Sequence, residues 1–394
     1  MVRKVKAAFS HQFGGEPLLF RSPGRVNLIG EHTDYNEGFV LPGAVDKAIV
    51  FAIAPRQDAE CRMYAADLEE AHRCTTNALE KSEKRWPNYL MGVVDQLQKA
   101  GFEVGGFDCA FGGNIPIGAG MSSSAAIEAG LAYALNELFH LGIDPLALVK
   151  LAQKAENEFV GVRCGIMDQF INIFGKEHRL VRLDCRSLEY VYVPFERVDI
   201  RIVLCDTQVK RELASSEYNV RRAQCEAGVH ILRRYDSSLR SLRDVSLDLL
   251  DAHKGEMDPV VYKRCAYVLK ENSRVLEACE HLSHGDVQSF GRKMFASHDG
   301  LRGEYEVSSP ELDVLVDAAS RVRGVLGARM MGAGFGGCTI NLVEDYAVSD
   351  FSETVRGTYR RSMGRDAKVY VSSICAGTSR IGAEDESPHE QGLS

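Results

Sequence analysis

Residues 113–126 have the composition of a phosphate-binding segment. Gly118 and Gly120 allow close approach of the backbone to a ligand because glycine has no Cβ, and Ser122 to Ser124 place hydroxyls where a helix would begin. The N–H groups at a helix N-terminus bind anions. The Walker pattern requires Gly-Lys followed by Ser or Thr, which the sequence does not contain. The segment therefore predicts an anion-binding loop, with a glycine-rich turn that merely caps a buried helix as the alternative.

A second polar segment, residues 25–35, brings two acids, an imidazole and a guanidinium around a short apolar run. These groups belong to Glu31, Asp34, His32 and Arg25. Carboxylates accept hydrogen bonds from sugar hydroxyls, and a buried polar site rejects isomers whose hydroxyls leave its groups unpaired. The segment predicts a polar ligand site, and the alternative is an exposed loop with incidental ion pairs.

A third candidate is Asp168, which follows a helix in a Gly-Ile-Met-Asp turn between apolar neighbours. A partly buried carboxylate in such a place is a candidate general base, although a structural turn aspartate fits the same pattern. The glycine cluster at 332–337 matches G-x-G-x-x-G but precedes an apolar strand instead of opening a helix. It therefore does not predict a dinucleotide site.

Composition limits the classes of partner. A chain of 394 residues predicts two domains, and a net charge of -8 disfavours nucleic acid or an anionic membrane as the main partner. The 11 cysteines are scattered without a C-x-x-C pair, as in a cytoplasmic protein with reduced thiols. No stretch approaches 18 uncharged apolar residues. We expect a cytoplasmic protein that acts on small molecules.

Periodicity and turn residues predict the elements that position these groups. A strand at 18–20 should break at Ser22-Pro23-Gly24, and Asp144 should cap a helix that starts at Pro145 and continues to about 160. The other expected helices are 89–100, 123–140 and 213–234, and the other expected strands are 45–54, 201–206, 338–343 and 367–374.

Taken together, these segments resemble the galactokinase members of the GHMP kinases, the family named for galactokinase, homoserine kinase, mevalonate kinase and phosphomevalonate kinase. Residues 24–35 are similar to the galactokinase signature, 116–126 to the ATP motif and 330–338 to the third family motif. Further segments that resemble galactokinases in the same order are 86–89, 165–170 and 213–218.

The resemblance implies an α+β, two-domain GHMP kinase fold with the active site between the domains. The amino-terminal ATP-binding domain, similar to domain 2 of ribosomal protein S5, would span 1–195. The carboxy-terminal ferredoxin-like domain would span 196–378, and 379–394 would be a disordered tail.

The resemblance also assigns roles by motif position. Asp168 would be the catalytic base with Arg25 beside it, and Ser124 and Glu156 would bind Mg²⁺. The sugar would contact Glu31, His32, Thr33, Asp34, Gly165 and Tyr218. The ATP phosphates would contact Gly118, Ala119, Gly120, Met121, Ser122, Ser123 and Ser124, with Trp86 near the adenine.

The reaction so implied is transfer of the ATP γ-phosphoryl group to O1 of α-D-galactose, with Mg²⁺ bound, by a monomer that needs no protein partner. Two alternatives stay open. One is a related kinase that phosphorylates N-acetylgalactosamine, galacturonate or arabinose at C1, and the other is a non-catalytic sensor of galactose and ATP.

Overall fold

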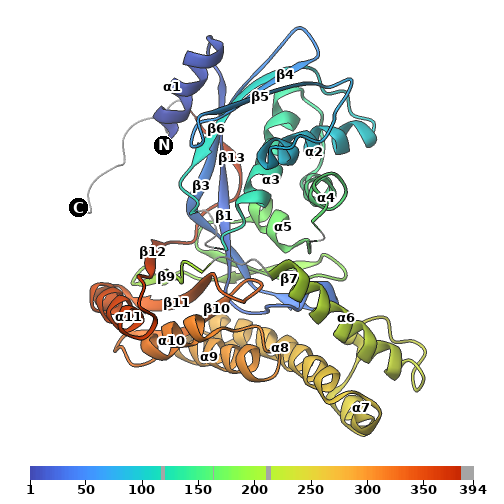
Figure 1. Ribbon diagram of the computed structural model, residues 1–394, viewed down its shortest axis with the longest axis vertical. Coiled ribbons are helices and arrows are strands. Elements are labelled where there is room, and N and C mark those ends of the chain that lie inside the picture. The colour runs from blue at the N-terminus through green and yellow to red at the C-terminus, as the bar shows by residue number, and fades with distance from the viewer. Residues whose placement is uncertain (117–119, 163, 210–213, 383–394) are drawn as a thin grey trace.

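The computed structural model describes residues 1–382 except 117–119, 163 and 210–213, and its elements form two halves (Figure 1). The upper half in Figure 1 contains a six-stranded sheet in the order β13-β1-β3-β6-β4-β5. Its strands are β1 (Leu18–Asn27), β3 (Pro42–Pro55), β4 (Glu60–Ala65), β5 (Glu70–Thr75), β6 (Phe107–Gly113) and β13 (Ser379–Arg380). Neighbouring strands are antiparallel except β4 and β6, which are parallel.

Helices cover both faces of this sheet. On one face α1 (Val2–Phe13) buries Val5 and Phe9 against residues of β1, β3 and β6. The other face is covered by α2 (Arg85–Lys99), α3 (Ser123–Leu138), α4 (Pro145–Lys154) and α5 (Met167–Phe174). The large apolar cluster between these helices and the sheet fixes the loops at the helix N-termini, where the polar motifs lie.

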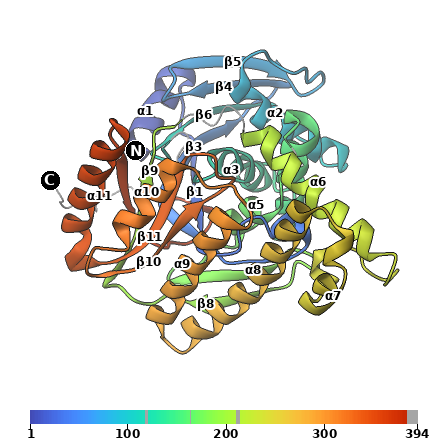
Figure 2. The same ribbon diagram turned by 60° about the horizontal axis from the view of Figure 1, so that its bottom comes forward.

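The lower half is built on a four-stranded antiparallel sheet in the order β10-β11-β9-β12. The strands are β9 (Ile200–Asp206), β10 (Val325–Met331), β11 (Cys338–Glu344) and β12 (Lys368–Ser372). The helices of this half are α6 (Ala214–Leu232), α7 (Leu247–Ala252), α8 (Pro259–Ser283), α9 (Val287–Gly303), α10 (Pro310–Ala319) and α11 (Val348–Met363). A three-stranded sheet of β2 (Phe39–Val40), β7 (Arg179–Asp184) and β8 (Tyr190–Pro194) packs against α8, which comes forward in Figure 2.

Strand β1 does not end where the sequence suggested. It continues to Asn27, so the predicted break at Ser22-Pro23-Gly24 is wrong, and the register with β3 only shifts between Pro23 and Gly24. Such a bulge absorbs a proline within a strand pair. A Cβ on Gly24 would lie 3.0 Å from the Met121 carbonyl oxygen, so this glycine brings β1 against the phosphate segment.

Most other predicted elements are confirmed. The strand predicted at 45–54 lies within β3, those at 201–206 and 338–343 are β9 and β11, and the helices at 89–100 and 123–140 are α2 and α3. Asp144 caps α4 as expected, accepting from the Leu146 and Ala147 N–H groups at 3.0 and 3.1 Å. Beyond α4 the predicted helix changes to a π-helical turn, Ala155–Val160.

The first two residues of the predicted tail belong to a strand. Ser379 and Arg380 form β13 beside Arg21 and Phe20, so the prediction of disorder from 379 is wrong for them, and 383–394 lie outside the described residues. The Thr378 hydroxyl donates to Asn172 at 2.6 Å, which ties this segment to α5.

We propose that the boundary between the two domains lies at 195/196, because β8 ends at Pro194 and β9 begins the other sheet at Ile200. Within the described ranges, no helix combines the length and apolar character needed to cross a bilayer.

Candidate active site

A cleft of about 1690 Å³ is lined by both halves of the molecule. The upper half contributes the loop after β1 and the N-terminal ends of α2, α3 and α5. The lower half contributes the end of β9, the first turns of α6 and the start of the 332–337 glycine cluster. Its lining thus contains parts of all three polar segments found in the sequence.

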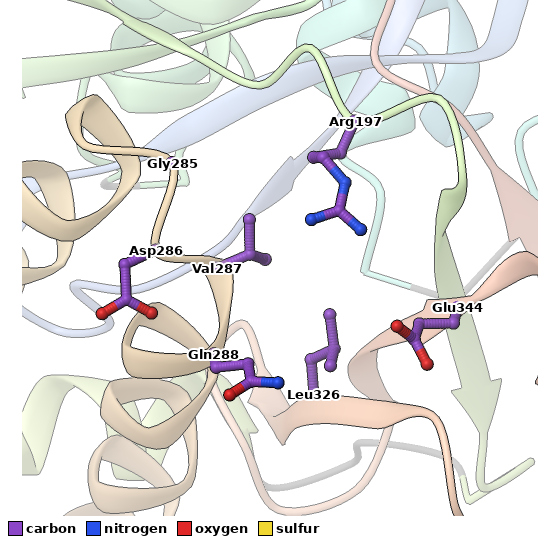
Figure 3. Close-up of a pocket in the computed structure, with 7 residues that line it drawn as sticks. All are labelled: Arg197, Gly285, Asp286, Val287, Gln288, Leu326 and Glu344. Carbon is purple, nitrogen blue, oxygen red and sulfur yellow. The ribbon is translucent and has the colours of Figure 1, made fainter.

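A second hollow of about 280 Å³ lies beside the N-terminus of α9 (Figure 3). Its charged groups already have partners: Arg197 pairs with Asp199 at 2.6 Å, Asp286 caps α9 by accepting from the Ser289 N–H, and Glu344 contacts the Tyr346 hydroxyl. Leu326 and Val287 form part of its wall. With these polar groups satisfied, this hollow offers less chemistry than the large cleft.

Arg25 and Asp168 form a bidentate ion pair in the cleft. Nε and Nη2 of Arg25 each lie 2.7 Å from one oxygen of Asp168, and the Ser122 hydroxyl donates to Oδ2. Arg25 also donates to the Gly120 carbonyl and so reaches the phosphate segment. Burial alone would lower the pKa of Arg25, but Asp168 outweighs it and keeps that pKa above its ordinary value. The site therefore holds a fixed positive charge beside a carboxylate.

Glu31 is held by the other half of the molecule. Its Oε1 accepts from Arg329 at 3.1 Å and from the Gly332 N–H at 2.9 Å, and its backbone carbonyl accepts from Tyr267. Arg329 has no exposed surface and also donates to the carbonyls of residues 27, 28 and 330. With Oε1 doubly occupied, Oε2 is the oxygen left to a ligand.

His32 lies in a buried group of aromatic rings. Its Nδ1 is 2.8 Å from the Tyr35 hydroxyl, which in turn is 2.7 Å from the Tyr305 hydroxyl. The rings of His32 and Tyr218 have centroids 5.6 Å apart. Burial lowers the pKa of His32 to about 3, so the ring is neutral at pH 7.

Asp34 lies against Gly165, another predicted sugar contact. A Cβ at residue 165 would be 1.9 Å from Oδ2 of Asp34, so a larger residue there would displace that carboxylate. Burial raises the pKa of Asp34 to about 6, with Asp168 and Glu31 adding to the rise and Arg25 opposing it. A ligand that donates hydrogen bonds would favour the ionised form.

Two predicted substrate contacts, Thr33 and Trp86, lie outside the cleft lining, as does the predicted metal ligand Glu156. Thr33 is fully buried and its hydroxyl bonds to the carbonyls of Gly30 and Phe39 at 2.8 and 2.6 Å, so it holds the loop and does not face a ligand. Trp86 is half-buried, donates to Glu70 at 2.9 Å and packs on Phe111. Its neighbours Arg85 and Tyr89, which sequence reasoning did not single out as ligands, do line the cleft.

On the phosphate side, residues 120–124 all line the cleft, while Gly118 and Ala119 lie outside the described residues. Ser122 occupies the N-cap position of α3 in a left-handed conformation but makes no side-chain cap, because its hydroxyl is turned to Asp168. The first N–H groups of α3 therefore lack the side-chain acceptor that Asp144 gives to α4. Such uncapped groups suit an anionic ligand.

Glu156 lies behind this helix end, nearly buried in the π-helical turn. It accepts from Gln169 at 2.8 Å and from the Cys164 thiol at 3.2 Å, and it contacts the Ser124 hydroxyl. Burial raises the pKa of Glu156 and raises that of its fully buried neighbour Glu128 to about 11. One carboxylate and one hydroxyl supply the hard oxygen donors that Mg²⁺ prefers while leaving most of its shell to phosphates and water.

Sequence reasoning missed the residues that hold this site from behind. Arg329, Glu128 and Gln169 are fully buried, and Tyr305 packs under His32. Two of them could have been recognised as charged residues inside apolar stretches, Glu128 in the alanine-rich helix and Arg329 beside Met330. Because unpaired charges are rarely buried, such a residue indicates a buried polar partner.

Comparison with known proteins agrees with this geometry. Residues 7–55 match the galactokinase galactose-binding signature, 88–176 the GHMP kinases N terminal domain and 275–360 the GHMP kinases C terminal domain. The chain is 43% identical over 379 residues to a galactokinase of Roseiflexus sp. (strain RS-1), covering 96% of this chain and 97% of that protein. It is 40% identical over 386 residues to a galactokinase of Fusobacterium nucleatum, covering 97% and 99%.

Among solved structures, that of Lactococcus lactis galactokinase complexed with galactose superposes with a TM-score of 0.91 at 37% identity, covering 96% of this chain and 99% of that one. The matches to both GHMP kinase domains confirm the expected two-domain α+β fold of an ATP-dependent sugar kinase. Within that class, the chain belongs to the galactokinase family.

Proposed function

We propose that this chain transfers the γ-phosphoryl group of ATP to O1 of α-D-galactose, giving α-D-galactose 1-phosphate and ADP, with Asp168 as the base. The Arg25–Asp168 pair carries this proposal, because it lies where the sugar segment and the phosphate segment meet. Phosphoryl transfer depends mainly on positioning and on compensating charge, and the pair supplies both.

Asp168 has an open acceptor position for the O1 proton. Oδ2 accepts from both Arg25 and Ser122, whereas Oδ1 accepts only from Arg25 among the hydrogen bonds of the described residues. A carboxylate oxygen has two lone pairs, so Oδ1 can take the proton while the guanidinium keeps the carboxylate in place. Arg25 then remains beside the charge on the transferring group.

The sugar side is assigned to Glu31, His32, Asp34, Gly165 and Tyr218, with Thr33 as a support of the loop. Oε2 of Glu31 and the carboxylate of Asp34 accept hydroxyl hydrogen bonds, and Gly165 keeps Asp34 in position. Because these groups are buried, a misplaced hydroxyl leaves a polar group unpaired, which favours galactose over its isomers.

The nucleotide side is assigned to residues 118–124, and Ser124 and Glu156 would hold Mg²⁺. When bound, Mg²⁺ neutralises charge on the nucleotide phosphates. The Gln169 amide donates a hydrogen bond to Glu156 and so holds its carboxylate beside the Ser124 hydroxyl. Trp86 would lie near the adenine, behind its neighbours Arg85 and Tyr89, which line the cleft.

We also propose that the protein acts in the cytoplasm, on free galactose and ATP. A net charge of -8 and eleven unbridged cysteines support this location. We propose a monomer, since both substrate sides of the cleft come from one chain.

The test is ADP release from Mg-ATP with galactose, N-acetylgalactosamine, galacturonate, arabinose, glucose and mevalonate in parallel. We expect galactose to be preferred and Asp168→Asn to lower kcat by about 10³-fold or more, since general bases contribute about 10²–10⁴. Calorimetry should still detect galactose and ATP binding to that variant. Asp199→Asn, which changes an exposed carboxylate paired with Arg197, is the matched control and should keep full activity.

Other outcomes would redirect the proposal. Preference for another sugar would retain the mechanism and change the substrate, and high activity in Asp168→Asn would remove Asp168 as the base. Galactose binding without turnover would indicate the non-catalytic sensor. The presence of all four proposed catalytic and metal-binding residues in one place argues against a sensor; they are Arg25, Ser124, Glu156 and Asp168.

A further inference from the structure

A pair of cysteines lies on neighbouring strands far from the base. Cys61 on β4 and Cys74 on β5 are direct partners in an antiparallel register. Residues directly opposite in such a pair have Cα atoms about 4.5–5.5 Å apart and share one face of the sheet. A disulfide requires Cα atoms about 4.4–6.8 Å apart. The register therefore brings these two thiols within bonding range without moving the strands far.

The two thiols differ in exposure. Cys61 is completely buried in the core between the sheet and α2, whereas Cys74 lies at the edge of that core and is partly exposed on the outermost strand. The side chains of Cys61 and Cys74 also interact directly with each other. Because Cys74 is the more exposed of the two, it is the thiol that a dissolved oxidant reaches first, and Cys61 is the neighbour that can attack it.

We propose that Cys61 and Cys74 form a reversible redox site that a hydroperoxide converts into a disulfide. Accessible cysteines that lie beside a second thiol react in this way. With hydrogen peroxide, the Cys74 thiolate attacks one peroxide oxygen, so that the O–O bond breaks, an S–O bond forms, and the hydroxide that leaves takes up a proton to give water. The Cys61 sulfur then attacks the Cys74 sulfenic acid, the S–S bond forms, and the sulfenic oxygen leaves as a second water with the Cys61 proton.

The neighbouring cysteine offers a matched control. Cys109 on β6 is directly opposite Met63, two residues along β4 from Cys61, so it is diagonal to Cys61 and two strands away from Cys74. Diagonal positions across strands are about 7–8 Å apart, beyond the reach of a disulfide. Cys109 is also fully buried, and burial raises the pKa of its thiol well above the ordinary value.

The test uses the full chain, reduced and then treated with hydrogen peroxide under native conditions. After denaturation, free thiols are alkylated and the chain is cut with trypsin, which releases Cys61 in Gln57–Arg62 and Cys74 in Cys74–Lys81. We expect these two peptides to be joined, unalkylated, and separated again by dithiothreitol. The Cys109→Ser variant should give the same linked pair.

Single variants separate the two roles. In Cys61→Ser, the oxidised Cys74 should be trapped as a sulfenic acid by dimedone, because the second thiol is missing. In Cys74→Ser, Cys61 should stay reduced because it is buried. Recovery of both residues in alkylated form from oxidised wild-type protein would overturn the proposal, as would linkage of Cys74 to Cys109.

Discussion

The two sides of the cleft are held in different ways. The sugar loop, residues 30–39, is bound by groups of the lower half: Glu271 accepts from the Gly30 N–H at 3.0 Å, Asn272 accepts from the Phe39 N–H at 2.9 Å, and Arg329 pairs with Glu31. The phosphate side is tied to β1 through Arg25 and leaves the start of α3 without a side-chain cap. The sugar side is therefore fixed before a ligand arrives, and the phosphate side keeps donors open for one.

This difference follows from the ligands each side is proposed to bind. Sugar isomers differ only in the direction of a hydroxyl, so their discrimination needs rigid, buried acceptors. Phosphates are anions with several equivalent oxygens, so open N–H groups and a nearby cation are sufficient. Substitutions on the two sides should therefore separate effects on galactose from effects on Mg-ATP.

The largest effect should come from Arg329→Met on the sugar side. It leaves the Glu31 carboxylate and the carbonyls of residues 27 and 28 without their buried donor, which costs about 3–5 kcal/mol. We expect a large fall in Tm and a galactose affinity lowered at least about tenfold, with ATP affinity retained in calorimetry. Arg264→Met removes an equally buried guanidinium that pairs with Glu306, away from the loop, and should lower Tm alone. Equal loss of galactose binding in both variants would contradict the comparison.

On the phosphate side, Glu156→Gln should separate function from stability. Burial raises the pKa of Glu156 above its value in the unfolded chain. At a pH above that unfolded-chain pKa, Glu156 therefore lowers the free energy of unfolding, and an uncharged amide of the same shape removes this destabilisation. We expect an unchanged or higher Tm, a KM for Mg-ATP raised about tenfold, and unchanged galactose affinity. Glu158→Gln, two residues away and exposed, is the control. A parallel loss of galactose binding would show that Glu156 supports the whole site.

The comparison also explains what the sequence could predict. The phosphate segment was readable because its chemistry is local, with glycines, serines and a helix start in consecutive residues. Arg25 and Glu31 were recognisable because they belong to a polar segment, and Asp168 because it is a lone acid between apolar neighbours. The family resemblance then related these three residues to one another. The bulge at Pro23 and Gly24 was missed because a proline-glycine pair signals a turn locally, whereas pairing with β3 carries the strand through it.

The support of the sugar loop could not be predicted in the same way. Arg329 and Glu31 are about 300 residues apart in the chain, and no local pattern says that a strand arginine turns inward to a loop of the other half. Thr33 was assigned to the ligand because it stands between His32 and Asp34, yet its hydroxyl is used by two backbone carbonyls. Only the tertiary contacts distinguish a residue that touches the ligand from one that shapes its loop.

Gly165→Ala sharpens the comparison inside the sugar side. The added methyl would lie 1.9 Å from Oδ2 of Asp34, so that carboxylate must move while Arg329 still holds Glu31. We expect the KM for galactose to rise about fivefold, the effect of losing one hydrogen bond of about 1 kcal/mol, with little change for ATP. Gly303→Ala, where a Cβ meets nothing within 4 Å, should match the wild type. Unchanged galactose kinetics would mean that Asp34 does not bind the sugar.

The smallest effect is on stability, and it depends on pH. Burial raises the pKa of Asp34 to about 6, above its value in the unfolded chain, so ionised Asp34 costs the folded state free energy that grows as pH rises and is complete above about pH 6. Asp34→Asn should therefore raise Tm at pH 8 by more than at pH 5, with at most about 2–3 kcal/mol gained, while galactose binding is lost. Asp199→Asn should have the opposite sign, because Arg197 lowers the pKa of Asp199 to about 2 and its ionised form stabilises the fold. If the Tm difference between Asp34→Asn and the wild type is the same at both pH values, then ionised Asp34 does not destabilise the protein without its ligand.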